Sequence, residues 1–159
     1  MHAYALAMLV PGAVLMFPVA LAGGSAVEEI AREQILASDP QWRENHDRYR
    51  PEPDMIEALK GKLGAGSSVD VYLGLWCADS RDHVPAFIKI VELLGPGLRV
   101  RYFNLPRKEN KETKFFIEEL GVERLPTFIF YLDGKEIGRI VEKPKTGLIE
   151  DILEIFFKS

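Results

Sequence analysis

The residues best suited to covalent chemistry in this sequence are Cys77 and its neighbours in the stretch Trp76-Cys77-Ala78-Asp79-Ser80. The 159-residue chain has a single cysteine, so no internal disulfide can form. The same count excludes a zinc site that needs two or more cysteine ligands. Any thiol chemistry of this protein therefore takes place at Cys77.

Cys77 lies where a predicted strand passes into a predicted helix. Before it, apolar residues alternate with others, as in a strand: Val69, Val71, Leu73 and Leu75. After it, apolar residues recur at helical spacing: Val84, Phe87, Ile88, Val91 and Leu94. The start of a helix offers unpaired N–H groups and a partial positive charge, and both favour a thiolate. Ser80, three residues on, is expected to direct its hydroxyl at the sulfur.

Ionisable side chains near Cys77 act in opposite directions. The carboxylate of Asp79 opposes ionisation of the thiol, whereas Arg81 offsets part of that charge, so the net effect stays open. His83 follows Asp79 by one helical turn. A metal site made of Cys77, His83 and either Glu142 or Asp79 has no known ligand spacing, so we expect no metal ion and no cofactor.

Periodicity and turn residues predict the elements that surround this site. In chain order they are a helix over 27–37, a polar surface segment over 41–53, a helix from Pro53 closed by Gly61, a strand over 98–103, a helix over 111–120, strands over 127–132 and 135–141 joined by Asp133-Gly134, and a helix over 146–157. A strand–helix–strand unit gives parallel strands, and the Asp-Gly turn adds an antiparallel pair. The sequence thus predicts an α/β fold with a mixed four-stranded sheet flanked by helices.

The first 26 residues contain no Asp, Glu, Lys or Arg. They are mostly apolar, and both Ala20-Leu21-Ala22 and Gly24-Ser25-Ala26 fit the cleavage site of a secretory signal peptide, although a positively charged start is missing. An uncleaved membrane anchor is the alternative, since about 20 apolar residues span a bilayer. We expect an exported protein, periplasmic or secreted, and otherwise a membrane-anchored one whose domain lies outside the cytoplasm.

Three segments follow from these patterns: a signal peptide or anchor over 1–26, an N-terminal helical extension over 27–66 and the α/β domain over 67–159. The formal net charge of −4 gives no basic surface for nucleic acid, so no nucleic-acid partner is expected. Contact with a membrane is expected only if the first segment stays uncleaved.

Several motifs of the α/β domain resemble those of the thioredoxin-like superfamily. They are Trp76-Cys77 followed by Ser80, which matches its W-C-x-x-C/S active-site pattern, Pro85 in the helix that follows, and Leu125-Pro126-Thr127-Phe128, which matches its cis-proline segment. The W-C-x-D-S variant is also similar to a branch of exported bacterial thioredoxin-like proteins. The resemblance implies that the cis-proline segment lies against the cysteine, and that Trp76, Leu125, Pro126 and Thr127 bind the substrate.

Three residues depart from that family pattern. Ser80 stands in place of the resolving cysteine, which excludes an internal dithiol–disulfide cycle. Val71 stands where many thioredoxins have a buried acid, and Glu142 stands where the family usually keeps a glycine beside the active site. We therefore predict Cys77 and Ser80 as catalytic residues, with Asp79, Arg81 and Glu142 modulating the site.

Two functions fit these residues. In the first, Cys77 is a lone nucleophile in exchange with protein or small-molecule thiols and disulfides, as in an oxidoreductase or isomerase without a resolving cysteine. In the second, the domain is a non-catalytic binding or chaperone-like module that uses the cis-proline groove.

Overall fold

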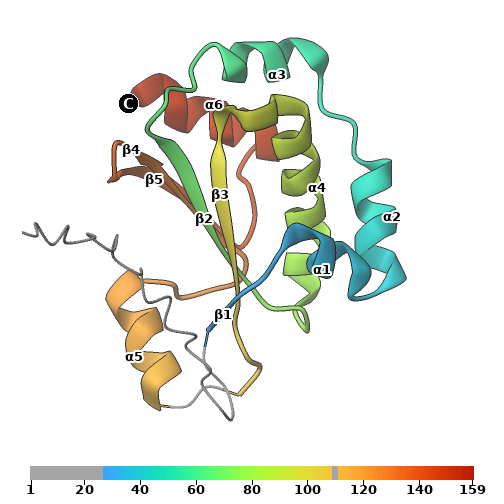
Figure 1. Ribbon diagram of the computed structural model, residues 1–159, viewed down its shortest axis with the longest axis vertical. Coiled ribbons are helices and arrows are strands. Elements are labelled where there is room, and N and C mark those ends of the chain that lie inside the picture. Colours follow the sequence, from blue (N-terminus) through green and yellow to red (C-terminus); the bar gives the residue numbers. More distant parts are fainter. Residues whose placement is uncertain (1–26, 109–110) are drawn as a thin grey trace, which may run out of the picture.

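A five-stranded mixed sheet forms the centre of the fold in the computed structural model, which describes residues 27–108 and 111–159. Its spatial order is β1-β3-β2-β4-β5 (Figure 1). The strands are β1 (Glu28–Glu29), β2 (Ser67–Leu73), β3 (Arg99–Asn104), β4 (Thr127–Leu132) and β5 (Lys135–Val141). Strands β2 and β3 run parallel, and all other neighbours are antiparallel. The predicted signal or anchor segment, residues 1–26, lies outside the described residues.

Helices lie on both faces of this sheet. They are α1 (Arg32–Ala37), α2 (Pro40–Arg48), α3 (Pro53–Lys60), α4 (Ala78–Leu94), α5 (Lys111–Leu120) and α6 (Leu148–Lys158), together with the 3₁₀ turn η1 (Gly95–Gly97). The prediction of an α/β fold with a mixed sheet flanked by helices is confirmed. Within the described ranges, none of the helices has both the length and the apolar character needed to cross a membrane.

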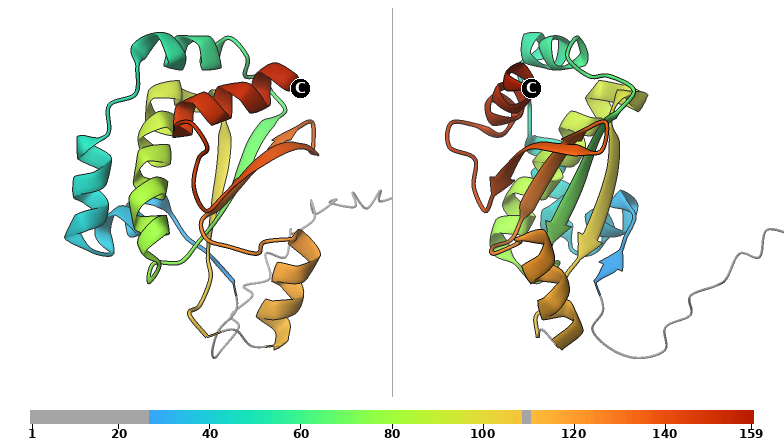
Figure 2. Two further views of the ribbon diagram at one scale, coloured as in Figure 1. Left: turned by 180° about the vertical axis from the view of Figure 1, so that it is seen from behind. Right: turned by 90° about the vertical axis from the view of Figure 1, so that its left-hand side faces the viewer.

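The two faces of the sheet carry cores of different size, because side chains alternate between the faces along each strand. Odd-numbered residues of β2 and even-numbered residues of β4 face the larger core, which α4, α6 and the three N-terminal helices cover. Tyr72 and Ile129 face the smaller core with residues of α5. Figure 2 shows α5 apart from the other helices, at the end of the sheet where β2 passes into α4. The start of α4, where Cys77 lies, is therefore placed between the helices of the larger core and α5.

The segment 27–37 differs from the predicted helix. Glu28 and Glu29 pair with Asn104 and Phe103 at the edge of β3, and the N–H of Ile30 donates to the carbonyl oxygen of Tyr102 at 2.9 Å. The helix begins only at Arg32. Because pairing with β3 occupies the backbone of the first residues, tertiary contact overrides the local helical spacing, and the sheet gains a fifth strand.

The segment 41–53 was predicted to be a polar surface segment, and this is wrong for its first part. Asp39 caps α2 by accepting a 2.7 Å hydrogen bond from the Gln41 N–H, and Pro40 is the first helical residue. Trp42 and His46, one turn apart, are both buried. Asp39-Pro40 thus ends α1 and starts α2. The spacing of apolar residues in the sequence indicates the end of α1 but not the start of α2.

A hydrogen bond connects α2 to α4 near Pro85, a proline inside α4. Pro85 has no N–H, so the carbonyl oxygen of Arg81 lacks its usual partner in the helix. The side-chain amide of Asn45, which is buried, donates to that oxygen at 2.8 Å. Sequence and packing are matched here, since an amide on α2 satisfies the acceptor that Pro85 leaves free.

We expect Asn45→Ala to lower the free energy of unfolding by about 1–3 kcal/mol, the usual cost of an orphaned buried polar group. In a Pro85→Ala background the alanine N–H can bond to the Arg81 carbonyl, so the same substitution should cost less. Urea unfolding of the four proteins of this double-mutant cycle measures the coupling. Equal costs in both backgrounds would contradict the role given to Asn45.

Candidate functional site

Cys77 is the N-cap residue of α4. Its backbone is extended (φ −93°, ψ 128°), and its carbonyl oxygen accepts the first helical hydrogen bond, from the Arg81 N–H at 3.1 Å. Its side chain makes no capping hydrogen bond. The half-buried sulfur thus lies at the end of a 17-residue helix, where unpaired N–H groups and the helix dipole favour negative charge.

The sulfur of Cys77 contacts the residue that precedes Pro126. Sγ lies 3.6 Å from the carbonyl oxygen of Leu125, to which the thiol donates, and the Leu125–Pro126 peptide bond is cis. Thr127 is buried at the start of β4, and its hydroxyl donates to the Arg124 carbonyl at 2.6 Å. The cysteine loop and the proline loop, which are nearly fifty residues apart in the chain, therefore meet at one place.

A cleft of about 300 Å³ opens beside the sulfur. Cys77, Asp79, Leu125 and Glu142 line it, and Trp76 forms part of its wall. Several further residues of the wall were not identified from the sequence, among them Leu105, Pro106, Arg107, Ile117 and Val122. They follow β3 or belong to α5 and the loop after it, so only the chain topology brings them to Cys77.

Trp76 is folded back across the loop between β2 and α4. Its indole N–H donates to the Leu105 carbonyl at 2.9 Å, although 47% of the residue's surface is exposed. The ring lies so close to Gly74 that a Cβ there would stand 2.8 Å from the ring atom Cε2. Gly74 is therefore needed for this close approach, and the indole presents an exposed apolar surface beside the thiol.

Ser80 is fully buried, and its contact differs from the expected one. Its hydroxyl oxygen accepts a 3.2 Å hydrogen bond from the Gly74 N–H, and this is the bond that the structure gives its side chain. Gly74 also accepts the N–H of Cys77 at 2.9 Å. Ser80 thus stabilises the loop that carries Cys77. Its effect on the sulfur is indirect, through the position of that loop.

The charged neighbours of Cys77 are paired in a way that the sequence did not indicate. The carboxylate of Asp79 lies 3.6 Å from Lys143 Nζ, while Arg81 lies 3.7 Å from Asp39. Arg81 therefore pairs with the N-terminal extension, and Lys143 is the cation that offsets Asp79. In the sequence, the only indication of this role of Lys143 was its position next to Glu142.

Glu142 has a backbone conformation that glycine favours. Its φ is +63°, and its N–H donates to the Pro126 carbonyl at 2.7 Å, so the position keeps the geometry expected of a glycine. Its carboxylate accepts a 2.7 Å hydrogen bond from Arg124, which raises the pKa of Arg124. The carboxylate beside the thiol is therefore neutralised by a cation at the mouth of the cleft.

We expect Glu142→Gly to raise the free energy of unfolding by about 0.5–1 kcal/mol. Relief of the left-handed conformation gains about 1–2 kcal/mol, and the added freedom of glycine in the unfolded chain removes about 0.4–1 kcal/mol of it. Urea unfolding measures the difference. Glu142→Gln, which keeps the conformation and removes the charge, is the matched control and should show no gain.

Two further residues considered from the sequence are Val71 and His83. Val71 is part of the larger core, and the neighbouring acid, Asp70, faces the other side of the sheet, where it forms a two-bond ion pair with Arg101. His83 is half-buried on α4. Across 27–108 and 111–159, no group of three or more His, Cys, Asp or Glu residues is placed to hold a metal ion.

Comparison with known proteins decides the family. A family model described as thioredoxin matches residues 24–152, most of the chain. The chain belongs to the thioredoxin-like superfamily. The match includes Cys77 at the start of α4 and the Leu125–Pro126 segment, and it confirms the resemblance seen in the sequence.

Thioredoxin-like relatives in other organisms are distant. A chloroplastic thioredoxin-like protein, CDSP32 from Arabidopsis thaliana, is 25% identical over 130 residues, which are 79% of this chain and 42% of that protein. Thioredoxin-like protein R548 of Acanthamoeba polyphaga mimivirus is 28% identical over 101 residues, 64% of this chain and 70% of that one. The chain thus spans less than half the length of the plant relative.

Among solved structures, a protein of unknown function from Pseudomonas aeruginosa shares the fold. The TM-score is 0.56 at 17% identity, over 80% of this chain and 86% of that one. The thioredoxin-like fold is therefore shared across a large part of both chains. Thioredoxin-like proteins generally act on protein thiols and disulfides, and the family is one of thiol–disulfide oxidoreductases.

Proposed function

We propose that this protein catalyses thiol–disulfide exchange through Cys77 as a single nucleophile. The observation that carries the proposal is the position of the sulfur: half-buried at the N-terminus of α4, open to a cleft and in contact with the Leu125 carbonyl. A thiolate is the reactive form of cysteine, and the cleft gives a substrate disulfide access to this sulfur.

In the first step the thiolate of Cys77 attacks one sulfur of a substrate disulfide. A bond forms between Sγ and that sulfur as the substrate S–S bond breaks, and the electron pair leaves with the second substrate sulfur, which takes a proton from solvent. The Cys77 thiol donates to the Leu125 carbonyl only while protonated, so that contact is released when the thiolate forms.

In the second step a thiol from outside the protein releases the product. Because Ser80 has no sulfur, a second thiolate attacks the substrate sulfur of the mixed disulfide, forms a new disulfide with it and returns the electron pair to Cys77. The net reaction exchanges one thiol for another in a disulfide. A substrate with a third cysteine, beside the two of its disulfide, can supply that thiol itself, which gives isomerisation.

Trp76, Leu125, Pro126 and Thr127 are proposed to hold the substrate chain beside the sulfur. The exposed indole of Trp76 and the side chain of Leu125 line the cleft, and Thr127 fixes the proline loop through its bond to Arg124. Arg107, also in the wall, together with the Arg124–Glu142 and Lys143–Asp79 pairs, makes the rim of the site charged. A partly apolar peptide disulfide suits such a lining.

Intact-mass spectrometry tests the proposal directly. Incubation with oxidised glutathione should give a single adduct of one glutathione on Cys77, and added small-molecule thiol should remove it. The native fold should accelerate adduct formation over the urea-unfolded chain. An adduct that forms no faster on the folded protein would contradict a catalytic Cys77.

A binding role without turnover is the second candidate, and the apolar side of the cleft favours it. Ile117, Val122 and Pro106 line the same cleft as the thiol and need no sulfur chemistry to bind a chain. This function predicts that Cys77→Ala binds a cysteine-free apolar peptide as well as the native protein does. Peptide binding combined with a folded-state adduct rate no higher than the unfolded one would favour it.

We propose, in addition, that the protein is exported and loses its first segment. The uncharged residues 1–26 and their small residues near position 22 and position 26 support this. Mass spectrometry of the mature chain from the producing cell tests it. A chain that starts after Ala22 or Ala26 is expected, and a mature protein that keeps Met1 would contradict cleavage.

A further inference from the structure

A second cleft, of about 900 Å³, lies at the other end of α4 from Cys77. It is bounded by α1, by the last turns of α4 and by β3, and Glu92 is one of its residues. Glu92 lies about 20 Å along the helix axis from Cys77. Nothing in the proposed exchange reaction uses this cleft.

Tyr102 is one of the residues that line this second cleft, and its buried hydroxyl has no hydrogen-bond partner among the described residues. Tyr102 is only 6% exposed, and in the described part of the chain its hydroxyl is the one buried side-chain N or O atom that no protein group satisfies. Burial raises the pKa of Tyr102, so the group stays a neutral donor and acceptor. An orphaned buried hydroxyl is costly, and it calls for a partner in the cleft.

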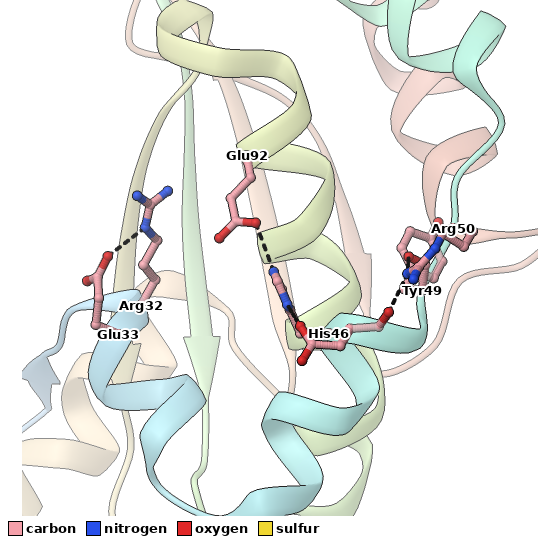
Figure 3. A network of polar contacts seen from close by, with 7 residues as sticks. Arg32, Glu33, His46, Tyr49, Arg50 and Glu92 are labelled. Carbon is pink, nitrogen blue, oxygen red and sulfur yellow. Dashed lines mark hydrogen bonds and ion pairs between the residues drawn. The ribbon is translucent and has the colours of Figure 1, made fainter.

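Opposite charges border the same space (Figure 3). Arg32 on α1 uses its Nε–H for a 2.8 Å bond to Glu33, and no hydrogen bond of the described residues occupies its two terminal nitrogens. Glu92 on α4 has one oxygen 2.9 Å from Nε2 of the buried His46, and its other oxygen is not bonded within those residues. His46 thus holds Glu92 in place, and the cleft has a free donor group and a free acceptor on different helices.

The lining also includes the apolar residues Ile30, Val91, Leu98 and Val100, beside the acidic Glu29 and Glu33. We propose that the cleft binds a zwitterionic ligand, an apolar amino acid or a short apolar peptide. Its carboxylate lies at Arg32, its ammonium group at Glu92, and one of its polar groups bonds to the Tyr102 hydroxyl. A ligand with both charges can meet all three groups at once.

Titration of protein labelled with ¹³C at tyrosine Cζ tests this, with L-leucine and the tripeptide trileucine as separate probes. The Tyr102 signal, assigned with Tyr102→Phe, should shift saturably with at least one probe, while the Tyr131 signal stays fixed. Acetylated and amidated trileucine, which lacks both charges, should leave the signal unchanged. The response to leucine against trileucine identifies the free amino acid or the peptide.

Variants make the result specific. Tyr102→Phe, which removes only the orphaned hydroxyl, and Glu92→Gln should each weaken binding at least about tenfold, measured by calorimetry with the same probe. Cys77→Ser should bind as the native protein does, so failure of the exchange reaction and failure of this site are distinguishable. No shift of Tyr102 with either zwitterion up to solubility, or equal binding of the blocked peptide, would overturn the proposal.

Discussion

Cys77→Ser is expected to lower the rate of thiol–disulfide exchange by at least about a hundredfold, to the rate of the buffer, because a serine hydroxyl is a far weaker nucleophile near neutral pH. The substitution changes one atom at a half-buried position, so the fold should remain intact. The rate is measured with a peptide disulfide that links a fluorophore to a quencher, in the presence of a small-molecule thiol.

The control for this experiment is the serine variant's own stability. Its urea midpoint should match that of the native protein, which shows that the lost rate is chemical. Ser80→Ala is the second control: it removes the bond from Gly74 but keeps the sulfur, so it should retain part of the activity. If Cys77→Ser still accelerates exchange, Cys77 is not the nucleophile of the reaction.

The second large effect is expected from Ser80→Cys, which should form an internal disulfide with Cys77 and raise the reductase rate at least about tenfold. A second sulfur on the first turn of α4 can attack the mixed disulfide from within the protein. Its effective concentration far exceeds that of a dissolved thiol, so release no longer depends on an external partner.

Thiol counting under mild oxidant measures the first part of this prediction, and turnover of the peptide disulfide with a dithiol reductant measures the second. Because position 80 is buried and its oxygen holds Gly74, a small loss of stability is expected as well. Ser80→Ala, which also removes the hydroxyl and has no sulfur, controls for that loss. A cysteine variant that keeps two free thiols would show that the two positions do not face each other.

Local sequence signals were sufficient to predict most of the fold. The order of elements from Val69 onward, the Asp133-Gly134 hairpin and the place of Cys77 at the start of a helix all follow from periodicity and turn chemistry. These features depend on residues close together in the chain. The mixed sheet followed from them, whereas the superfamily followed from the resemblance of the motifs at Trp76-Cys77, Pro85 and Leu125-Pro126.

Features that depend on contacts between distant segments were missed. Glu28 and Glu29 form a strand only because the edge of β3 is open to them, and α2 is stabilised by the packing of Trp42 against the larger core. The pairing of Arg81 with Asp39 was likewise missed, since the two come close only after α2 packs on α4. Charge pairing is determined by the folded geometry, which spacing along the chain does not contain.

The candidate site shows the same division. Its nucleophile and proline loop could be predicted from motifs, whereas the Lys143–Asp79 ion pair and the apolar wall from α5 could not. Ser80 is instructive, because its position was predicted and its contact was not. Its hydroxyl bonds to Gly74, a residue that carried no signal of such a role.

The most direct test of a reactive Cys77 is its alkylation rate near neutral pH. Since the chain has one cysteine, iodoacetamide consumption reports this sulfur alone. The reference is a synthetic peptide of residues 72–82, in which the same cysteine has no helix and no cleft. We expect the folded protein to react several times faster than the peptide, because the N-terminus of α4 favours the thiolate. A folded protein that reacts more slowly than the peptide would show that the sulfur is shielded, and would contradict the proposed chemistry.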